Sequence, residues 1–188
     1  MYNYKNNNLT FLSKSLSKRF PSIYYYSIQG ESVVKIPVSL IKIFFTFIKN
    51  HTSTNFSQLI DITALDHPER QSRFELVYQL ISYAYNQRLT VNVSIPEGVY
   101  VDSITSIYPS AGWYEREIWD RFGIFFKNHN DFRRRLTDYG FKGHPLRKDF
   151  PVTGFIEVRY DTFSKSIQYE KVSLPQEYRF FFNYKNWS

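Results

Sequence analysis

The stretch QLIDITALDHPERQSRFELVYQLISYAYNQRLTVNVSI, residues 58–95, decides the fold because it consists of consecutive segments with strand-forming composition. It contains three β-rich runs, at 58–66, 73–85 and 89–95. The last run alternates apolar and polar side chains, which is the pattern of a half-buried strand. Turn-forming residues separate the runs at Pro68 and Asn86 and end the last one at Pro96. The stretch therefore predicts a sheet that is mostly antiparallel or mixed.

Upstream of this stretch, the sequence predicts a hairpin followed by a helix. The β-rich runs 22–28 and 32–36 are separated by a short turn that contains Gly30. Pro37 is suited to the first position of a helix that extends to about Asn50. Its bulky apolar residues should form one stripe that packs on the sheet, made of Leu40, Ile43, Phe44, Phe47 and Ile48.

Downstream, regular structure gives way to a charged helix and irregular chain. We expect a short edge strand within 101–108 and a helix at 111–122, with Gly123 as the residue that ends it. A short helix is expected at 131–136. Residues 155–161 should form one more strand or an extended arm.

Together these elements predict an α+β fold, with a mixed or antiparallel sheet, helices packed on it, a charged helix and an extended C-terminal arm. We expect a loose N-terminus at 1–8 and a domain at 9–161, beginning with a helix at 9–20. The remaining segment, 162–188, is aromatic and charged and lacks helical periodicity. It should lie on a neighbouring protein as an arm.

Composition excludes several kinds of site. The chain has no cysteine, so thiolate zinc sites, disulfides, cysteine-ligated iron–sulfur clusters and a cysteine nucleophile are all excluded. The four histidines have no metal-ligand spacing. The longest apolar stretch, Val38 to Ile48, is interrupted by Lys42 and is far shorter than the roughly 20 residues that span a membrane. Residues 1–30 carry four bases and no acid, which fits an organelle-targeting segment or an amphipathic helix.

Residues 113–151 are the most informative segment for function, since acids, bases and aromatic rings alternate there almost without filler. Aromatic residues and arginines anchor protein interfaces, and a core tolerates so many charges only when they are paired. The segment thus predicts a protein-binding surface. A nucleic-acid interpretation would rest on the consecutive arginines 133–135 and the aromatic rings, but acids in the same segment would repel phosphates.

An enzymatic interpretation has less support. Glu115 and Glu117 are two residues apart, so on a helix they point in nearly opposite directions and cannot act as a carboxylate pair. The sequence identifies no carboxylate partner for His129. Gly140 and Gly143 match neither phosphate-binding glycine pattern, and turns account for them better. Whether the lone chain has any catalysis is left open, without a candidate catalytic residue.

The segment 113–151 closely resembles the 30-kDa subunit family of respiratory complex I, the proton-pumping NADH:ubiquinone oxidoreductase. The matching motifs are Glu115-Arg116-Glu117, Trp119-Asp120, Phe122-Gly123, His129, Arg133-Arg134, Leu136-Thr137-Asp138-Tyr139-Gly140-Phe141 and Gly143-His144-Pro145-Leu146-Arg147-Lys148-Asp149-Phe150-Pro151. The resemblance extends over roughly residues 9–187. It places the segment from Leu9 to Ile28 within the family domain.

The resemblance implies a structural subunit of the peripheral arm, which supports the module that passes electrons from iron–sulfur clusters to ubiquinone. The implied main partner is the 49-kDa subunit, which helps form the quinone site. No cofactor is expected on this chain, since FMN, iron–sulfur clusters and ubiquinone belong to the whole complex. The implied location is the matrix side of the mitochondrial inner membrane, and residues with A/T-rich codons favour a mitochondrial gene. Two alternatives stay open: an independent nucleic-acid-binding module, and the equivalent subunit of a complex I-related hydrogenase.

The resemblance also implies which residues form the partner interface: Glu115, Arg116, Glu117, Asp120, Arg133, Arg134, His144, Pro145, Arg147, Lys148 and Asp149. The alternative is that some of these charges pair only within the chain. At three positions the sequence departs from the family pattern. Arg121 and Arg135 replace usual apolar residues and Asn130 replaces a usual proline. Either a partner supplies acids to the two arginines, or local packing differs.

Overall fold

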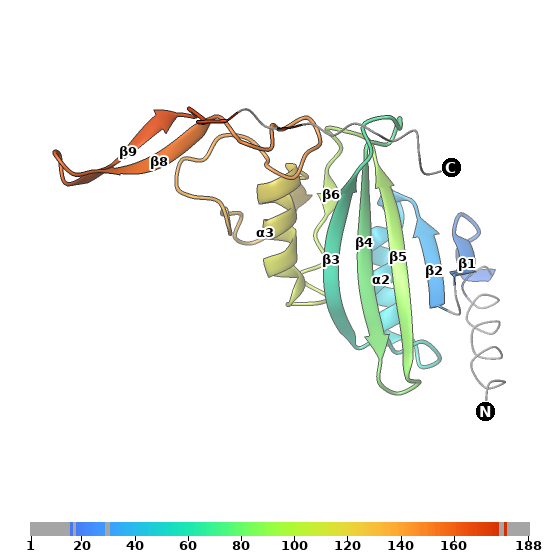
Figure 1. The fold of residues 1–188 in the computed structure, drawn as a ribbon. Coiled ribbons are helices and arrows are strands. Elements are labelled where there is room, and N and C mark those ends of the chain that lie inside the picture. Colours follow the sequence, from blue (N-terminus) through green and yellow to red (C-terminus); the bar gives the residue numbers. More distant parts are fainter. Residues whose placement is uncertain (1–15, 17, 29–30, 177–178, 180–188) are drawn as a thin grey trace. The chain divides into compact units, whose positions relative to one another are not determined.

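A computed structural model describes residues 16, 18–28, 31–176 and 179 of the chain (Figure 1). The chain divides into two compact units, 1–148 and 149–188. The C-terminal arm expected at 162–188 falls within the second unit, and its start at residue 162 stays a prediction. The predicted loose segment 1–8 and most of the predicted helix 9–20 lie outside the described residues.

The first unit is built on a five-stranded mixed sheet. Its strands, in spatial order, are β1 (Tyr24–Ile28), β2 (Glu31–Ile36), β5 (Gln87–Ile95), β4 (Phe74–Ser82) and β3 (Gln58–Asp66). Only β2 and β5 pair in parallel, and the other three pairs are antiparallel. The predicted fold class and all five strands of this sheet are therefore confirmed.

Helix α2 (Ile41–Asn50) covers one face of the sheet and follows a short 3-10 helix, η1 (Val38–Leu40) (Figure 1). Every second residue of β4 is buried, and the Tyr78 ring of this strand lies 4.9 Å from that of Phe45 in α2. The buried face of α2 is Ile41, Phe44, Phe45 and Ile48.

The predicted apolar stripe of α2 was therefore wrong in part. Phe44 and Ile48 are buried as expected, but Ile43 is 60% exposed and Leu40 belongs to η1. The helix is apolar on most of its circumference, so periodicity alone could not select which side faces the sheet. Packing against the sheet selects the side that carries Ile41 and Phe45.

Helix α3 (Ala111–Phe122) lies beside the edge strand β3 (Figure 1). The Tyr114 hydroxyl donates a hydrogen bond to the Ile60 carbonyl over 2.7 Å, where a bulge interrupts the β3–β4 register. An exposed strand edge invites pairing with other chains, and α3 protects this one. The predicted helix 111–122 is confirmed, and so is Gly123 as its cap, with a φ of 76°.

Two short parallel strands hold the chain on both sides of α3. They are β6 (Val101–Asp102) and β7 (Phe126–Lys127). The strand expected within 101–108 is therefore only two residues long. The helix expected at 131–136 is absent, because backbone N–H groups in that segment bond to the side chain of Asp120 and not to one another.

The second unit contains an antiparallel hairpin of β8 (Ile156–Asp161) and β9 (Ser166–Lys171). The Asp161 carboxylate accepts backbone N–H bonds from Phe163 and Ser164 and so fixes the turn. Strand β8 confirms the strand expected at 155–161. In the described part of the chain, no helix is long and apolar enough to cross a membrane.

Candidate partner interface

The acids of α3 face opposite sides of the helix. Glu115 is completely buried, whereas Glu117 is partly exposed and lies 3.5 Å from Arg121 and 2.8 Å from Arg135. The sequence predicted this divergence from helical geometry, and the structure confirms it. Asp120, like Glu115, is fully buried.

Asp120 organises the irregular segment that follows β7. Its Oδ1 accepts hydrogen bonds from Arg134 Nη1 at 2.9 Å and from the Thr137 hydroxyl at 2.6 Å. Its Oδ2 accepts the backbone N–H groups of residues 135, 136 and 137. One carboxylate thus replaces the hydrogen bonds of a helical turn and holds this segment against α3.

The environment of Asp120 lowers its pKa. Burial by itself would raise the pKa, but the bonds from the Thr137 hydroxyl, the two backbone N–H groups of 136 and 137, and the Arg134 guanidinium outweigh burial. They hold the pKa at about 2. Asp120 is therefore charged throughout the physiological pH range and is paired inside this chain.

The segment that follows Gly143 caps the C-terminal end of α3. The last carbonyls of a helix lack partners within the helix. Here the carbonyl of Asp120 accepts from His144 Nδ1 at 3.1 Å, that of Arg121 from the Leu146 N–H at 3.1 Å, and that of Phe122 from Arg147 Nε at 2.6 Å. The Arg147 charge also complements the negative end of the helix dipole.

The side chains of the capping segment lie directly against Gly123. A Cβ at this position would lie 2.6 Å from the Arg147 guanidinium and 2.7 Å from the His144 ring. The residue also has the left-handed backbone that L side chains rarely adopt. Both constraints require glycine where α3 meets the capping segment.

An ion network connects the cap to the end of the sheet. Arg73 donates to both carboxylate oxygens of Asp66 at 2.8 and 3.0 Å. Glu97 accepts from Arg73 at 3.2 Å and from Arg147 at 3.0 Å. The Lys148 N–H donates to Asp66 at 2.8 Å. The Arg73 hydrogen bond is the main cause that lowers the pKa of Asp66, so this buried acid stays charged.

Sequence reasoning did not single out Asp66, Arg73 or Glu97 as site residues. They lie far from Arg147 along the chain, and no spacing rule connects them to it. The available signal was that the resemblance extends over roughly residues 9–187, a range that includes all three. The structure brings these three together with two predicted residues, Arg147 and Lys148.

The three consecutive arginines are each paired with a different acid of this chain. Arg133 forms a bidentate pair with Asp131, Arg134 binds Asp120, and Arg135 binds Glu117. This pairing removes the free basic run on which the nucleic-acid alternative rested. It also shows that four of the predicted interface charges, Glu117, Asp120, Arg133 and Arg134, have ion-pair partners within the chain.

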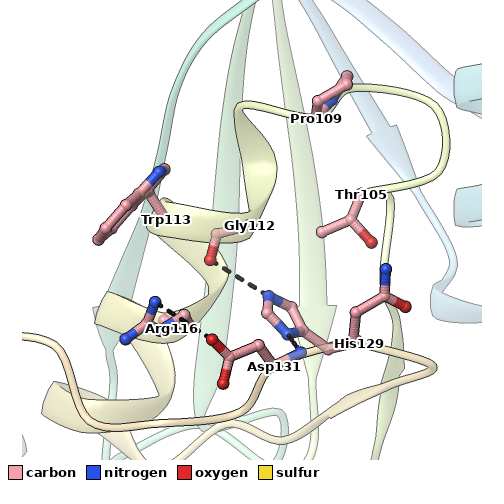
Figure 2. A pocket seen from close by; sticks show the side chains of 8 residues that line it. Thr105, Pro109, Gly112, Trp113, Arg116, His129 and Asp131 are labelled. Carbon is pink, nitrogen blue, oxygen red and sulfur yellow. Dashed lines mark hydrogen bonds and ion pairs between the residues drawn. The ribbon is translucent and has the colours of Figure 1, made fainter.

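Contacts within this chain account for two of the three positions that depart from the family pattern. Arg121 and Arg135 both bind Glu117, so this chain itself supplies the acid that they need. Asn130, the third departure, is one of the residues that line a cleft of about 330 Å³. Figure 2 shows this cleft.

Several groups of this region stay available to a partner. Trp113 is exposed, and the guanidinium groups of Arg116 and Arg135 lie 5.1 and 5.3 Å from its ring centroid. Arg133 has a 75% exposed side chain. Tyr139 is also almost fully exposed. A tryptophan with flanking arginines has the composition of an interface anchor.

Residues 34–156 match the family model described as respiratory-chain NADH dehydrogenase, 30 Kd subunit. The chain belongs to this family. The predicted resemblance is thereby confirmed. NADH-ubiquinone oxidoreductase subunit 9 of Prototheca wickerhamii is 49% identical over 158 residues, which cover 84% of this chain and 82% of the relative. The NADH-ubiquinone oxidoreductase subunit 9 of Reclinomonas americana is 47% identical over 170 residues, which cover 89% and 83%.

Similar proteins also come from bacteria and from a related kind of complex. A subunit of the NADH-quinone oxidoreductase of Ruegeria pomeroyi is 54% identical over 152 residues, which cover 81% of this chain and 76% of the relative. A chain in the structure of the membrane-bound sulfane sulfur reductase, an archaeal respiratory membrane complex, superposes with a TM-score of 0.67 and 27% identity. That match covers 76% of this chain and 85% of the other.

In the described part of this chain, no group of side chains is arranged to hold a metal ion. No three His, Cys, Asp or Glu side chains gather there as a metal site would require. The site residues of this region are therefore charges and aromatic rings that bind one another or face outward.

Proposed function

We propose that this protein is a structural component of the peripheral arm of complex I, without catalysis or a cofactor of its own. Its role is to hold the module that passes electrons from iron–sulfur clusters to ubiquinone. Its main partner is the 49-kDa subunit. Its location is the matrix side of the mitochondrial inner membrane. Support comes from relatives that are subunits of NADH-ubiquinone oxidoreductase.

One observation carries this proposal: the β8–β9 hairpin has an exposed apolar face. Side chains alternate across a strand, so one face collects Ile156, Val158, Tyr160, Ile167 and Tyr169. Each of these is between 57% and 61% exposed. The other face is polar, with Arg159 paired to Glu170 at 2.7 Å.

An isolated two-stranded hairpin is only marginally stable in water, and a contiguous exposed apolar face marks a binding surface. The hairpin is therefore suited to lie on another protein through the Val158–Tyr169 side. The exposed anchors of the first unit, Trp113 and Arg133, supply a second contact. Both units dock on subunits of the same complex, with 149–188 as the arm.

Native electrophoresis of detergent-solubilised mitochondrial membranes tests this function. The tagged chain should migrate in the high-molecular-mass band that carries NADH dehydrogenase activity. Cross-linking within that band should recover peptides of the 49-kDa subunit. A chain found only as a free protein would refute the proposal.

Substitutions at two adjacent positions of β9 test whether the apolar face of the β8–β9 hairpin binds a partner. Ile167→Asp places a charge on the apolar face and should reduce incorporation into the complex. Gln168→Asp introduces the same charge one residue away, on the polar face opposite Arg159, and should incorporate normally. Both positions are exposed, so thermal unfolding of the free chain should be unchanged for both variants. Equal incorporation of both would show that the apolar face is not used.

A further inference from the structure

Glu115 is a buried carboxyl group with too few hydrogen-bond partners for a charge. Its side chain is fully buried between α3, the loop after β6 and the loop after β7. One oxygen, Oε1, accepts the backbone N–H of Ile104 at 2.9 Å. The other oxygen, Oε2, has no hydrogen-bond partner among the described residues. A buried carboxylate without a cation is strongly disfavoured, whereas a protonated carboxyl is tolerated.

The groups that face Glu115 do not compensate for a negative charge. From β4, the Tyr78 hydroxyl is buried and also lacks a described partner. Burial and the Glu115 charge both raise the pKa of Tyr78, so this phenol stays neutral. The Ser103 hydroxyl, from the loop after β6, shares a hydrogen bond with the Thr105 hydroxyl. Hydrogen bonding from Ser103 and from the Ile104 N–H lowers the pKa of Glu115, but both groups are neutral and burial outweighs them. His129 is the group near enough to exchange a proton, with Nε2 at 3.9 Å from Oε2.

His129 is one of the residues that line the cleft of Figure 2, and its ring is held in a defined tautomer. Its Nδ1 accepts the backbone N–H of Asp131 at 3.1 Å, so in the neutral ring the proton resides on Nε2. That Nε2–H donates to the Gly112 carbonyl at 3.2 Å. The ring therefore stands between Glu115 on one side and the cleft, lined by Asp131 and Arg116, on the other.

We propose that Glu115 is a buried proton-binding site, which exchanges its proton with solvent through His129 and the cleft. In the uptake step, Nδ1 releases the Asp131 N–H and takes a proton from a hydronium ion in the cleft, which leaves a neutral water molecule. Nε2 then gives its proton to Glu115 Oε2, and the ring remains neutral with its proton on Nδ1. Because 3.9 Å exceeds hydrogen-bond length, the ring must first approach Glu115.

Burial is the main cause that raises the pKa of Glu115, to about 7 from an ordinary value of 4.5. The folded chain thus binds more protons than the unfolded chain between the two pKa values. The stability that Glu115 contributes should be greatest below its unfolded pKa and should be lost as pH rises through the folded pKa. Loss of the proton leaves an unpaired charge between α3 and two loops, so it should loosen their contact near Ile104.

Infrared spectroscopy of the full chain tests the site directly. At about pH 6, below the raised pKa, the wild type should show the C=O band of a buried carboxylic acid, which should disappear by about pH 9. Glu115→Gln should lack this band. Glu117→Gln, two residues along the same helix and partly exposed, should retain it. A wild type without the band at the lower pH, or a band that survives Glu115→Gln, would overturn the assignment.

Urea unfolding gives an independent measurement. The wild-type midpoint should shift to lower urea between about pH 5 and about pH 8, and Glu117→Gln should keep this shift. Glu115→Gln should remove the part of the shift that Glu115 contributes, because the amide is neutral at both pH values. A variant that kept the whole shift would argue against proton binding at Glu115.

The proposed route is tested by a pH jump on His129→Asn. The carboxylic acid band of Glu115 should relax more slowly in this variant than in the wild type, because the asparagine side chain cannot take up and release a proton. Thr105→Val, which changes another residue of the cleft without removing the imidazole, should relax like the wild type. Unchanged relaxation in His129→Asn would exclude His129 as the path.

Discussion

Arg134 donates a hydrogen bond from Nη1 to Oδ1 of the fully buried Asp120 over 2.9 Å, which joins α3 to the loop 14 positions later. Its neighbour Arg133 is instead 75% exposed and pairs with Asp131 on the surface. Two consecutive arginines thus have different roles, one inside the domain and one available to a partner. The predicted interface residues include both arginines, and the structure distinguishes them by the burial of the acid that each one pairs with.

This difference predicts opposite behaviour for two charge reversals. Arg134→Glu places an acid against Asp120 and should lower the free energy of unfolding by about 3–5 kcal/mol, as when a buried pair loses one member. Arg133→Glu should leave the unfolding of the free chain unchanged but reduce incorporation into the complex. Chemical denaturation and native electrophoresis measure the two effects. If both variants unfold like the wild type, Asp120 does not depend on Arg134.

Asp120 predicts an acid-dependent loss of stability. Its pKa is lowered to about 2 from 3.8, so its contribution is complete above pH 3.8 and disappears as pH falls through 2. The difference between these two pKa values corresponds to a contribution of on the order of 2 kcal/mol to the free energy of unfolding. Asp120→Asn should lose this stability at neutral pH and show a smaller change as pH falls through that window. Asp61→Asn, at an exposed position of β3, is the control and should follow the wild type.

Gly123 and Gly140 allow a matched test of the segment that caps α3, because they share the same backbone conformation. Their φ angles are 76° and 75°, but only at Gly123 would a Cβ collide with His144 and Arg147. Gly140→Ala should lower stability only by the left-handed strain of about 1–2 kcal/mol. Gly123→Ala should lower it further, because the cap must open. Thermal unfolding measures both effects. Equal decreases in Tm for the two variants would show that the collision at Gly123 does not matter.

Truncation distinguishes the capping segment from the arm. A chain that ends at Lys148 keeps all the bonds from the capping segment to α3 and Asp66, so it should fold with nearly the wild-type Tm and fail to assemble. A chain that ends at Pro145 loses the bonds from Leu146, Arg147 and Lys148. These are four bonds to residues outside the capping segment, since Arg147 bonds to both Phe122 and Glu97. At about 1 kcal/mol for each hydrogen bond, this loss should be about 4 kcal/mol. Equal Tm values for the two truncations would show that the cap is not needed.

Local patterns in the sequence were sufficient for most of the elements. The strands of the sheet, the extent of α3 and its end at Gly123 all follow from periodicity and turn chemistry over a few residues. The segment 131–136 was predicted wrongly as a helix because its backbone donors go to Asp120, which precedes it by more than ten residues. Side-chain competition over that distance leaves no periodic signal.

The sequence by itself determined the family, the sheet and the opposite orientation of Glu115 and Glu117, since these depend on local spacing and extended motifs. Only the tertiary structure decided which of the two acids is buried, which of Arg133 and Arg134 is engaged inside the chain, and that residues 144–148 close the end of α3. The physical reason is that pairing and burial are set by contacts between distant segments. Residue spacing constrains the direction of a side chain but not what lies opposite it.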